Sequence, residues 1–142
     1  MGLSFQEKSL WLVLSSLVVA YGCYFYQAFA NMGPLDAAAD VQPHQIALFT
    51  AAVVLLVIMQ VAGHVVIAMV DRRSDTDERD RLIGLEGTRN GAYVLAAGVF
   101  CSLCVALATE GNFIFTHLLL GSWVLAQLVE TASQLVLHRR GA

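Results

Sequence analysis

Charged residues are scarce in this chain, and their scarcity excludes an ordinary soluble fold. Only 13% of the 142 residues are charged, whereas 58% are apolar. A soluble globule of this size needs more polar side chains than that to cover its surface. The charges are also bunched rather than interspersed along the chain. The composition therefore predicts one compact membrane domain that comprises residues 1–142.

Several chemical signatures are missing as well. The net charge is -3, and acidic and basic residues crowd into the same segment, so we expect no direct nucleic-acid partner. No phosphate-binding loop, HExxH or GxSxG motif is present. Serine, histidine and acidic residues do not converge on a plausible nucleophile. We therefore expect a protein that is not an enzyme, and we predict no cofactor.

Four apolar runs span residues 10–30, 45–70, 91–108 and 113–137, and cations are absent from two of their three connections. Each run is near the roughly 20 residues that a helix needs to cross a bilayer core. Every Lys and Arg residue lies before the first run, between the second and third, or after the fourth: Lys8, Arg72, Arg73, Arg79, Arg81, Arg89, Arg139 and Arg140. This distribution predicts four spans with both termini in the cytoplasm.

The resulting fold class is all-α, an integral membrane four-helix bundle with its third helix extended into the cytoplasm. The expected location is the prokaryotic inner (plasma) membrane, so the lipid bilayer is its first partner. Pro43 suits the first turn of a helix, because the N–H that proline lacks would be unpaired there anyway. The second helix is therefore expected to begin at that residue. A tight external turn at residues 110–112 should lead into the fourth helix.

The only strongly charged block, residues 71–81, precedes the third run. Ser74 or Asp75 is a candidate N-cap, and Glu78 stands three residues after Asp75, as a capping box requires. No helix breaker separates this block from the third run apart from glycines, which membrane helices tolerate. We therefore expect one long helix that is cytoplasmic over about 75–90 and embedded in the membrane after that.

Charges of both signs alternate along this cytoplasmic helix. Such alternation predicts a docking strip for a soluble cytoplasmic protein or for a second protomer. A solvated helix whose charges pair only with one another is the alternative interpretation. The strip consists of Asp77, Glu78, Arg79, Asp80, Arg81 and Glu86, with Arg89 at its end.

Small residues line one face of the third helix, at Gly84, Gly87, Gly91, Gly98 and Ser102. Gly87 and Gly91 form a GxxxG motif, which lets another backbone approach closely in lipid. Two interpretations are open, namely packing within the protomer and the interface of a homodimer.

Polar side chains gather in the cytoplasmic third of the expected spans. Glu130 lies nine residues before Arg139, roughly 13 Å inside the cytoplasmic end at 1.5 Å per residue. Intramembrane ionisable residues are costly and usually functional, so these positions are candidates for a proton or ligand site. A structural hydrogen-bond network is the alternative. The candidates are Glu130, His64, Gln60, Gln127, Gln134, Arg89 and Asn90, with Ser15 and Ser16 at similar depth.

The cysteines form a second, weaker candidate site. Cys101 and Cys104 are three residues apart on one helical face, and Cys23 and His117 lie at broadly similar depth in the first and fourth runs. Thiolates with an imidazole would suit a soft metal such as Cu(I) or Zn(II), and the CxxC pattern would suit thiol exchange. Inert packing is the alternative, because apolar burial raises the pKa of a thiol. The metal content is unknown.

The middle of the chain carries one family resemblance. The run Asp77-Glu78-Arg79-Asp80-Arg81-Leu82-Ile83, with Glu86, Arg89 and a small-residue span after it, resembles a family of small four-span prokaryotic membrane proteins of uncharacterised function. Members bear a D-E-R-D block before the third span. The resemblance implies a membrane-bound sensing or sequestering role beside helix-turn-helix regulators, and it implies no catalytic residues.

Three functional hypotheses follow from the sequence. The first is a small, dimeric, non-enzymatic inner-membrane protein that acts as an interaction or sensing partner through its charged helix. The second is a small proton-coupled transporter or ligand-binding permease. In it Glu130 would bind the proton or cation, His64 would relay or coordinate, and glutamines would orient the ligand. The third is a membrane thiol redox or soft-metal protein.

Overall fold

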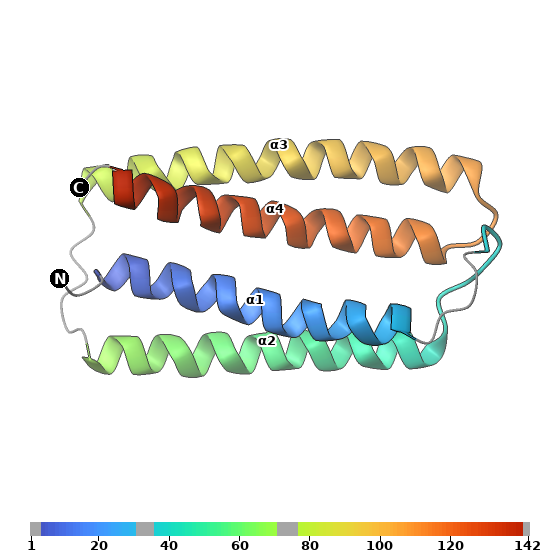
Figure 1. Cartoon of the computed structure of the whole chain (residues 1–142), viewed down its shortest axis with the longest axis horizontal. Coiled ribbons are helices and arrows are strands. Elements are labelled where there is room, and N and C mark those ends of the chain that lie inside the picture. The colour runs from blue at the N-terminus through green and yellow to red at the C-terminus, as the bar shows by residue number, and fades with distance from the viewer. Residues whose placement is uncertain (1–3, 31–35, 71–76, 141–142) are drawn as a thin grey trace.

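The computed structural model describes residues 4–30, 36–70 and 77–140 of the chain. It contains four helices, and no strand occurs among these residues. The helices run alternately up and down, so the first residues of α1 and α3 lie at the same end as the last residues of α2 and α4 (Figure 1). All four are long and apolar enough to cross a membrane. The prediction of an all-α four-helix bundle is confirmed. The helices are α1 (Phe5–Ala30), α2 (Pro43–Val70), α3 (Glu78–Ala108) and α4 (Phe113–Arg140).

Local capping explains where the first two helices begin. α2 starts at Pro43, the residue expected from its missing N–H. α1 starts at Phe5, before its apolar run, because Ser4 and Glu7 form a capping box. The Glu7 N–H donates to the Ser4 hydroxyl over 3.2 Å, and the Ser4 N–H donates to the Glu7 carboxylate over 3.0 Å. Two N–H groups that the helix leaves unpaired are thereby satisfied.

α3 is one continuous helix of 31 residues, as the absence of a breaker predicted. It begins at Glu78, and its N-cap is Asp77, whose carboxylate accepts a 2.7 Å hydrogen bond from the Glu78 N–H. The expected N-caps, Ser74 and Asp75, lie outside the described residues. The start near residue 75 was therefore placed too early, because Asp77 has the extended backbone of a cap and not a helical one.

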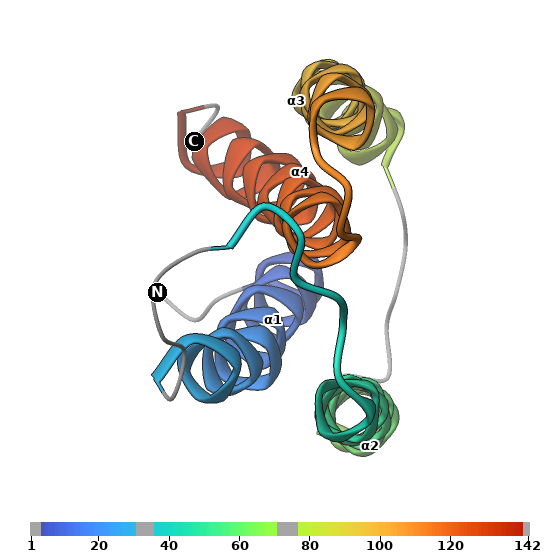
Figure 2. The same cartoon turned by 90° about the vertical axis from the view of Figure 1, so that its right-hand side faces the viewer.

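The helices lie in the spatial order α2, α1, α4, α3. α3 packs on α4, α4 packs on α1 and α1 packs on α2, whereas α2 contacts neither α3 nor α4 in the described part of the chain. Seen along the bundle, α2 and α3 lie on the same side, and no helix joins them there (Figure 2). We call this side, between α2 and α3, the open side.

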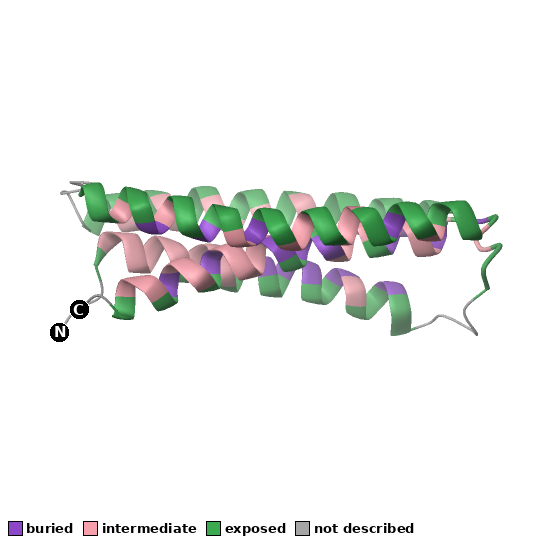
Figure 3. Cartoon of the chain, turned by 90° about the horizontal axis from the view of Figure 1, so that it is seen from above, coloured by how far each residue is buried: buried purple, intermediate pink, exposed green. Residues whose placement is uncertain are grey.

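Burial follows the seams between neighbouring helices (Figure 3). Leu17 and Tyr21 of α1 pack against Val124 of α4, and Tyr24 and Ala28 of α1 lie in a second cluster that includes residue 52 of α2. Many large apolar side chains face outward instead. This is the expected distribution for a bundle in lipid, because hydrocarbon tails solvate such side chains as well as a protein core does.

At one end, the connection before α2 is hydrogen-bonded to the turn before α4, and we call this contact, formed by residues 36–42 and 109–113, the clasp. The Gly111 N–H donates to the Ala37 carbonyl over 3.0 Å. The side-chain oxygen of Asn112 accepts from the Val41 N–H over 2.7 Å. A Cβ at Gly111 would collide with the Ala39 carbonyl, so glycine permits this close approach.

We expect Gly111→Ala to lower the free energy of unfolding by about 1–3 kcal/mol, because the added methyl forces the two segments apart. The measurement is thermal unfolding in detergent, followed by circular dichroism. Gly22→Ala is the matched control, since no atom lies within 4 Å of a Cβ there. Equal unfolding temperatures for the two variants would contradict a tight clasp.

Candidate functional site

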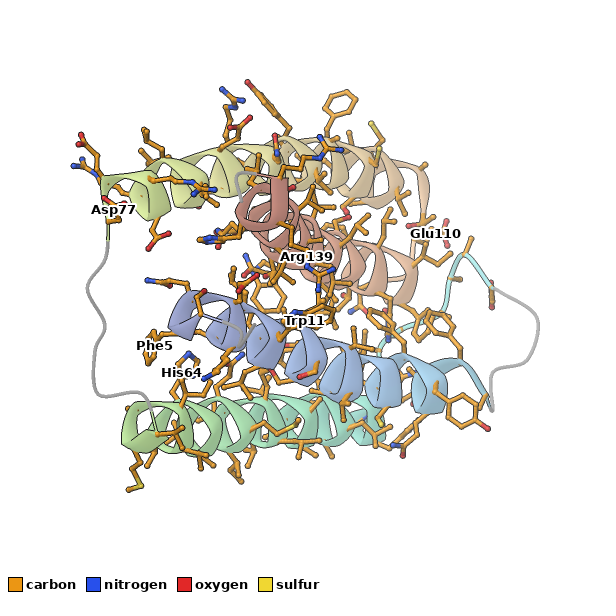
Figure 4. The ribbon with its side chains drawn as sticks, turned by 60° about the vertical axis from the view of Figure 1, so that its left-hand side comes forward. Phe5, Trp11, His64, Asp77, Glu110 and Arg139 are labelled. Carbon is orange, nitrogen blue, oxygen red and sulfur yellow. The ribbon has the colours of Figure 1, made fainter. Side chains whose placement is uncertain are left out.

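His64 and Gln60 form a polar ladder with α1, which we call the α1–α2 ladder. The ring Nε2 of His64 lies 2.9 Å from the Ser9 hydroxyl, and Nδ1 lies 2.8 Å from the Gln60 carbonyl oxygen. A carbonyl can only accept, so Nδ1 is the donor, and in the neutral ring Nε2 accepts from Ser9. The Gln60 amide donates to Ser16 Oγ over 2.9 Å. Figure 4 shows His64 between α1 and α2.

Glu130 belongs to a different contact, the polar part of the α3–α4 seam. The Thr88 hydroxyl donates to Glu130 Oε1 over 2.8 Å, and the Asn90 amide donates to Ser133 Oγ over 3.3 Å. Both bonds join α3 to α4 at the depth where α3 changes from charged to apolar. The Glu130 carboxylate is therefore paired with the Thr88 hydroxyl. Together with the Asn90–Ser133 bond, this pair helps to set the register of α3 against α4.

Small residues allow this seam to close. A Cβ at Gly91 would lie 3.0 Å from the Ala126 carbonyl oxygen, and one at Gly98 would collide with Ser122. Gly87 faces the side chain of Gln134 in the same way, whereas nothing lies within 4 Å of a Cβ at Gly84. Of the two interpretations of the small-residue face, packing within the protomer is the one that the contacts of α3 support.

The structure does not bring His64 and Glu130 together. His64 faces α1, Glu130 faces α3, and α2 makes no contact with α4 within the described residues. Arg89 pairs with Glu86 over 3.3 Å on the exposed surface of α3. Ser15 donates to the Leu12 carbonyl of its own helix over 3.1 Å. The candidates thus divide between two helix pairs, and no single polar centre holds them all.

The soft-metal candidates are also spread out. Cys23, Cys101 and Cys104 are free and exposed. Both ring nitrogens of His117 are engaged, Nδ1 with the Phe113 carbonyl at 2.9 Å and Nε2 with the Tyr24 hydroxyl at 3.0 Å. In the part of the chain that the structure describes, no three His, Cys, Asp or Glu side chains gather as a metal site would require.

The charged segment of α3 has one inward and several outward side chains. Asp80 faces α4, with its carboxylate 3.7 Å from Nδ1 of His138. Asp77, Glu78, Arg79 and Arg81 are exposed. The end of α4 is in turn held against α1, since the Arg139 guanidinium lies 5.8 Å from the centroid of the Trp11 ring (Figure 4).

The sequence identified the candidate residues His64 and Glu130 but not their hydrogen-bond partners. Ser9 and Thr88 hold His64 and Glu130, yet a single hydroxyl beside charged residues carries no signal of its own. The Tyr24–His117 pair was also missed, although both residues stand at the same end of their spans. Matching depth was the available signal for that pair.

The chain matches no protein-family model, and comparisons with curated proteins and with solved structures find no match either.

Close packing of α3 on α4 can be tested with two glycine substitutions on α3, one of which is a control. We expect Gly91→Val to lower the free energy of unfolding by about 1–3 kcal/mol, because the side chain would push against the α4 backbone. Gly84→Val should be near neutral, since that position is open. Unfolding of both variants by added sodium dodecyl sulfate measures the difference. A Gly84 variant that is as unstable as the Gly91 variant would contradict close packing at the seam.

A second prediction separates a structural role of Glu130 from a proton-binding role. Glu130→Leu removes the acceptor of the Thr88 bond and should lower stability by about 0.6 kcal/mol, whereas Glu130→Gln keeps an accepting oxygen and should change stability little. The same detergent titration measures both variants. Proteoliposomes provide the functional test. Loss of a pH-driven flux in the stable Gln variant would favour the transporter hypothesis over a structural bond.

Proposed function

We propose that this chain is a small non-enzymatic membrane protein that docks a soluble protein through the charged first part of α3. The observation that carries this proposal is the continuity of α3 from an exposed, charged segment into an apolar span. Its 31 residues extend roughly 46 Å at 1.5 Å per residue, against a bilayer core of about 30 Å. The excess length suits a helix that leaves the membrane at residues 78–90.

Rigidity of the charged segment supports this role. α4 runs beside it and holds it through the Asp80–His138 contact, the Thr88–Glu130 hydrogen bond and the packing of Gly87 on α4. A helix that is already ordered loses little conformational entropy when a partner binds. Alternating exposed charges favour one register of docking, because a shifted partner would bring like charges together.

A groove beside the charged segment offers an apolar contact. It has a volume of about 430 Å³ and lies between α3 and α4. Val129, Ala132 and Val136 provide apolar lining, while Glu86 and Arg140 carry opposite charges at its edge. An apolar centre with a polar rim is the usual composition of a protein interface. The groove would therefore take apolar side chains of the partner while the charges of α3 align it.

The cations support an orientation. Lys8, Arg79, Arg81, Arg139 and Arg140 lie at the end opposite the clasp, which we call the cationic end. In the proposal this end faces the cytoplasm of a prokaryotic inner membrane, following the bias of Lys and Arg toward that side. A homodimer is also part of the proposal, because within the described residues α2 packs on α1 alone and has a long apolar face that a second protomer would cover.

The test is a charge reversal on the exposed face of α3. Arg79→Glu combined with Arg81→Glu should reduce the amount of a soluble protein that co-purifies with the chain from native membranes by about tenfold, as loss of about 1.4 kcal/mol would. Quantitative mass spectrometry of the purified complex measures this. The loss should be greatest at low salt, since exposed charges are screened as ionic strength rises.

Glu110→Lys is the matched control, because it changes an exposed charge at the clasp end. It should leave the co-purifying protein in place. Retention of every co-purifying protein by the Arg79 and Arg81 variant would refute docking. An accessibility tag at residue 142 that reacts only from outside the cell would refute the orientation.

A further inference from the structure

A cavity lies on the open side of the bundle, in the half nearer the clasp. Its volume is about 420 Å³, which is within the range of about 300–1,000 Å³ that ligand pockets have. Side chains from every helix line it, including Tyr24 of α1, Phe49 of α2, Leu95 of α3 and Trp123 of α4. Because α2 does not pack on α3 within the described residues, a molecule dissolved in the bilayer can reach the cavity from the side.

One lining residue of this cavity carries a hydrogen-bond donor that has no partner among the described residues. Gln45 lines the cavity and is only 6% exposed. Its side-chain oxygen accepts from the Gln42 N–H over 2.8 Å, but its amide nitrogen makes no hydrogen bond within the described residues. No fully buried side-chain nitrogen or oxygen lacks a partner in this part of the chain, so the Gln45 nitrogen keeps some accessible surface in a residue that lines the cavity.

The other buried polar group in the lining, the Tyr24 hydroxyl, already donates its hydrogen bond within the protein. The Tyr24 hydroxyl lies 3.0 Å from Nε2 of His117. Nδ1 of His117 donates to the Phe113 carbonyl over 2.9 Å, so in the neutral ring Nε2 accepts and the tyrosine donates to it. The cavity therefore offers the Gln45 amide as its free buried donor. None of its lining residues is charged, which favours a neutral ligand.

The position of the donor indicates how such a ligand lies. Gln45 is in the first turn of α2, near the edge of the apolar layer, while Phe49 and Trp123 line the cavity further along their helices. An acyl ester in a leaflet has its polar and apolar parts in the same order, with its carbonyl at the edge of the hydrocarbon and its chain directed inward. A donor without a partner is costly in that layer, so an ester carbonyl that accepts from it would relieve the cost.

We propose that this cavity binds the acyl ester of a membrane lipid from the leaflet at the clasp end, with the ester carbonyl accepting from Gln45 Nε2 and the acyl chain beside Trp123. The site is separate from the docking segment of α3, which lies at the opposite end of the bundle. The two proposals can therefore fail independently.

Tryptophan fluorescence tests this site directly, because the chain has only two tryptophans. Trp11→Phe leaves Trp123 in the cavity as the single reporter. The probes are the methyl ester of a dibrominated 18-carbon fatty acid and a dibrominated 18-carbon alkane, added to the full-length variant in detergent. We expect saturable quenching by the ester at a concentration on the order of fivefold lower than for the alkane, the value of one hydrogen bond.

Gln45→Glu is the sharpest variant, since it keeps the oxygen that accepts the Gln42 N–H and replaces the donating nitrogen. In the Trp11→Phe background at neutral pH, it should abolish the preference for the ester and leave quenching by the alkane unchanged. Trp123→Phe, which leaves Trp11 near the cationic end, should show no preference for the ester. Gln45→Met repeats the test without a charge if the Glu variant does not fold.

Equal quenching of Trp123 by ester and alkane in the protein that retains Gln45 would overturn the proposal, whatever the variants do. Unsaturable quenching that matches the response of Trp11 would overturn it as well. The cavity would then hold only solvating hydrocarbon.

Discussion

Close contact between α3 and α4 is the interaction on which the rest of the structure depends. In lipid no hydrophobic effect drives one helix against another, so the backbones must approach closely enough for dispersion and hydrogen bonding to hold them. Glycines at positions 87, 91 and 98 permit that approach, and the Thr88–Glu130 bond fixes the register. The seam runs along both the apolar span and the charged segment of α3. Packing on α4 therefore keeps these two parts of α3 aligned as one helix.

The same constraint explains why the bundle has two halves. α1 and α2 are joined by a polar ladder of their own, through Ser9, Ser16, Gln60 and His64. His64 and Glu130 thus each find a partner within their own helix pair, while α1 and α4 are joined by apolar packing and by the Tyr24–His117 hydrogen bond. α2 does not pack on α3 among the described residues, and the open side lies between them.

The sequence predicted helices well and neighbours poorly. Hydropathy located the four apolar runs, because length and lack of charge suffice to identify a span, and Pro43 located the start of α2. Periodicity also showed which residues share one helix face. It cannot show which helix lies opposite that face, so equal depth wrongly suggested that Gln60 and Glu130 belong to one centre. The N-cap was misplaced because Asp75 and Asp77 are chemically equivalent candidates, and only backbone geometry chooses between them.

The clasp links the seam to the cavity. Asn112, just before α4, binds the Val41 N–H, and Val41 lines the cavity two residues before α2 begins. The connection therefore fixes where α2 starts relative to α4, and with it the place of Gln45 in the cavity lining. At the cationic end the structure has no equivalent contact between α2 and α4 in its described residues. The two ends thus differ in what holds them: backbone hydrogen bonds hold the end with the apolar cavity, whereas side-chain contacts between α3 and α4 align the charged segment.

A ligand in the cavity would contact α2 near the clasp, while a protein at the charged segment would contact α3 and α4. Because α1 lies between α2 and the α3–α4 pair, its contacts with α4 connect the two sites. These contacts include the packing of Leu17 and Tyr21 on Val124 and the Tyr24–His117 hydrogen bond.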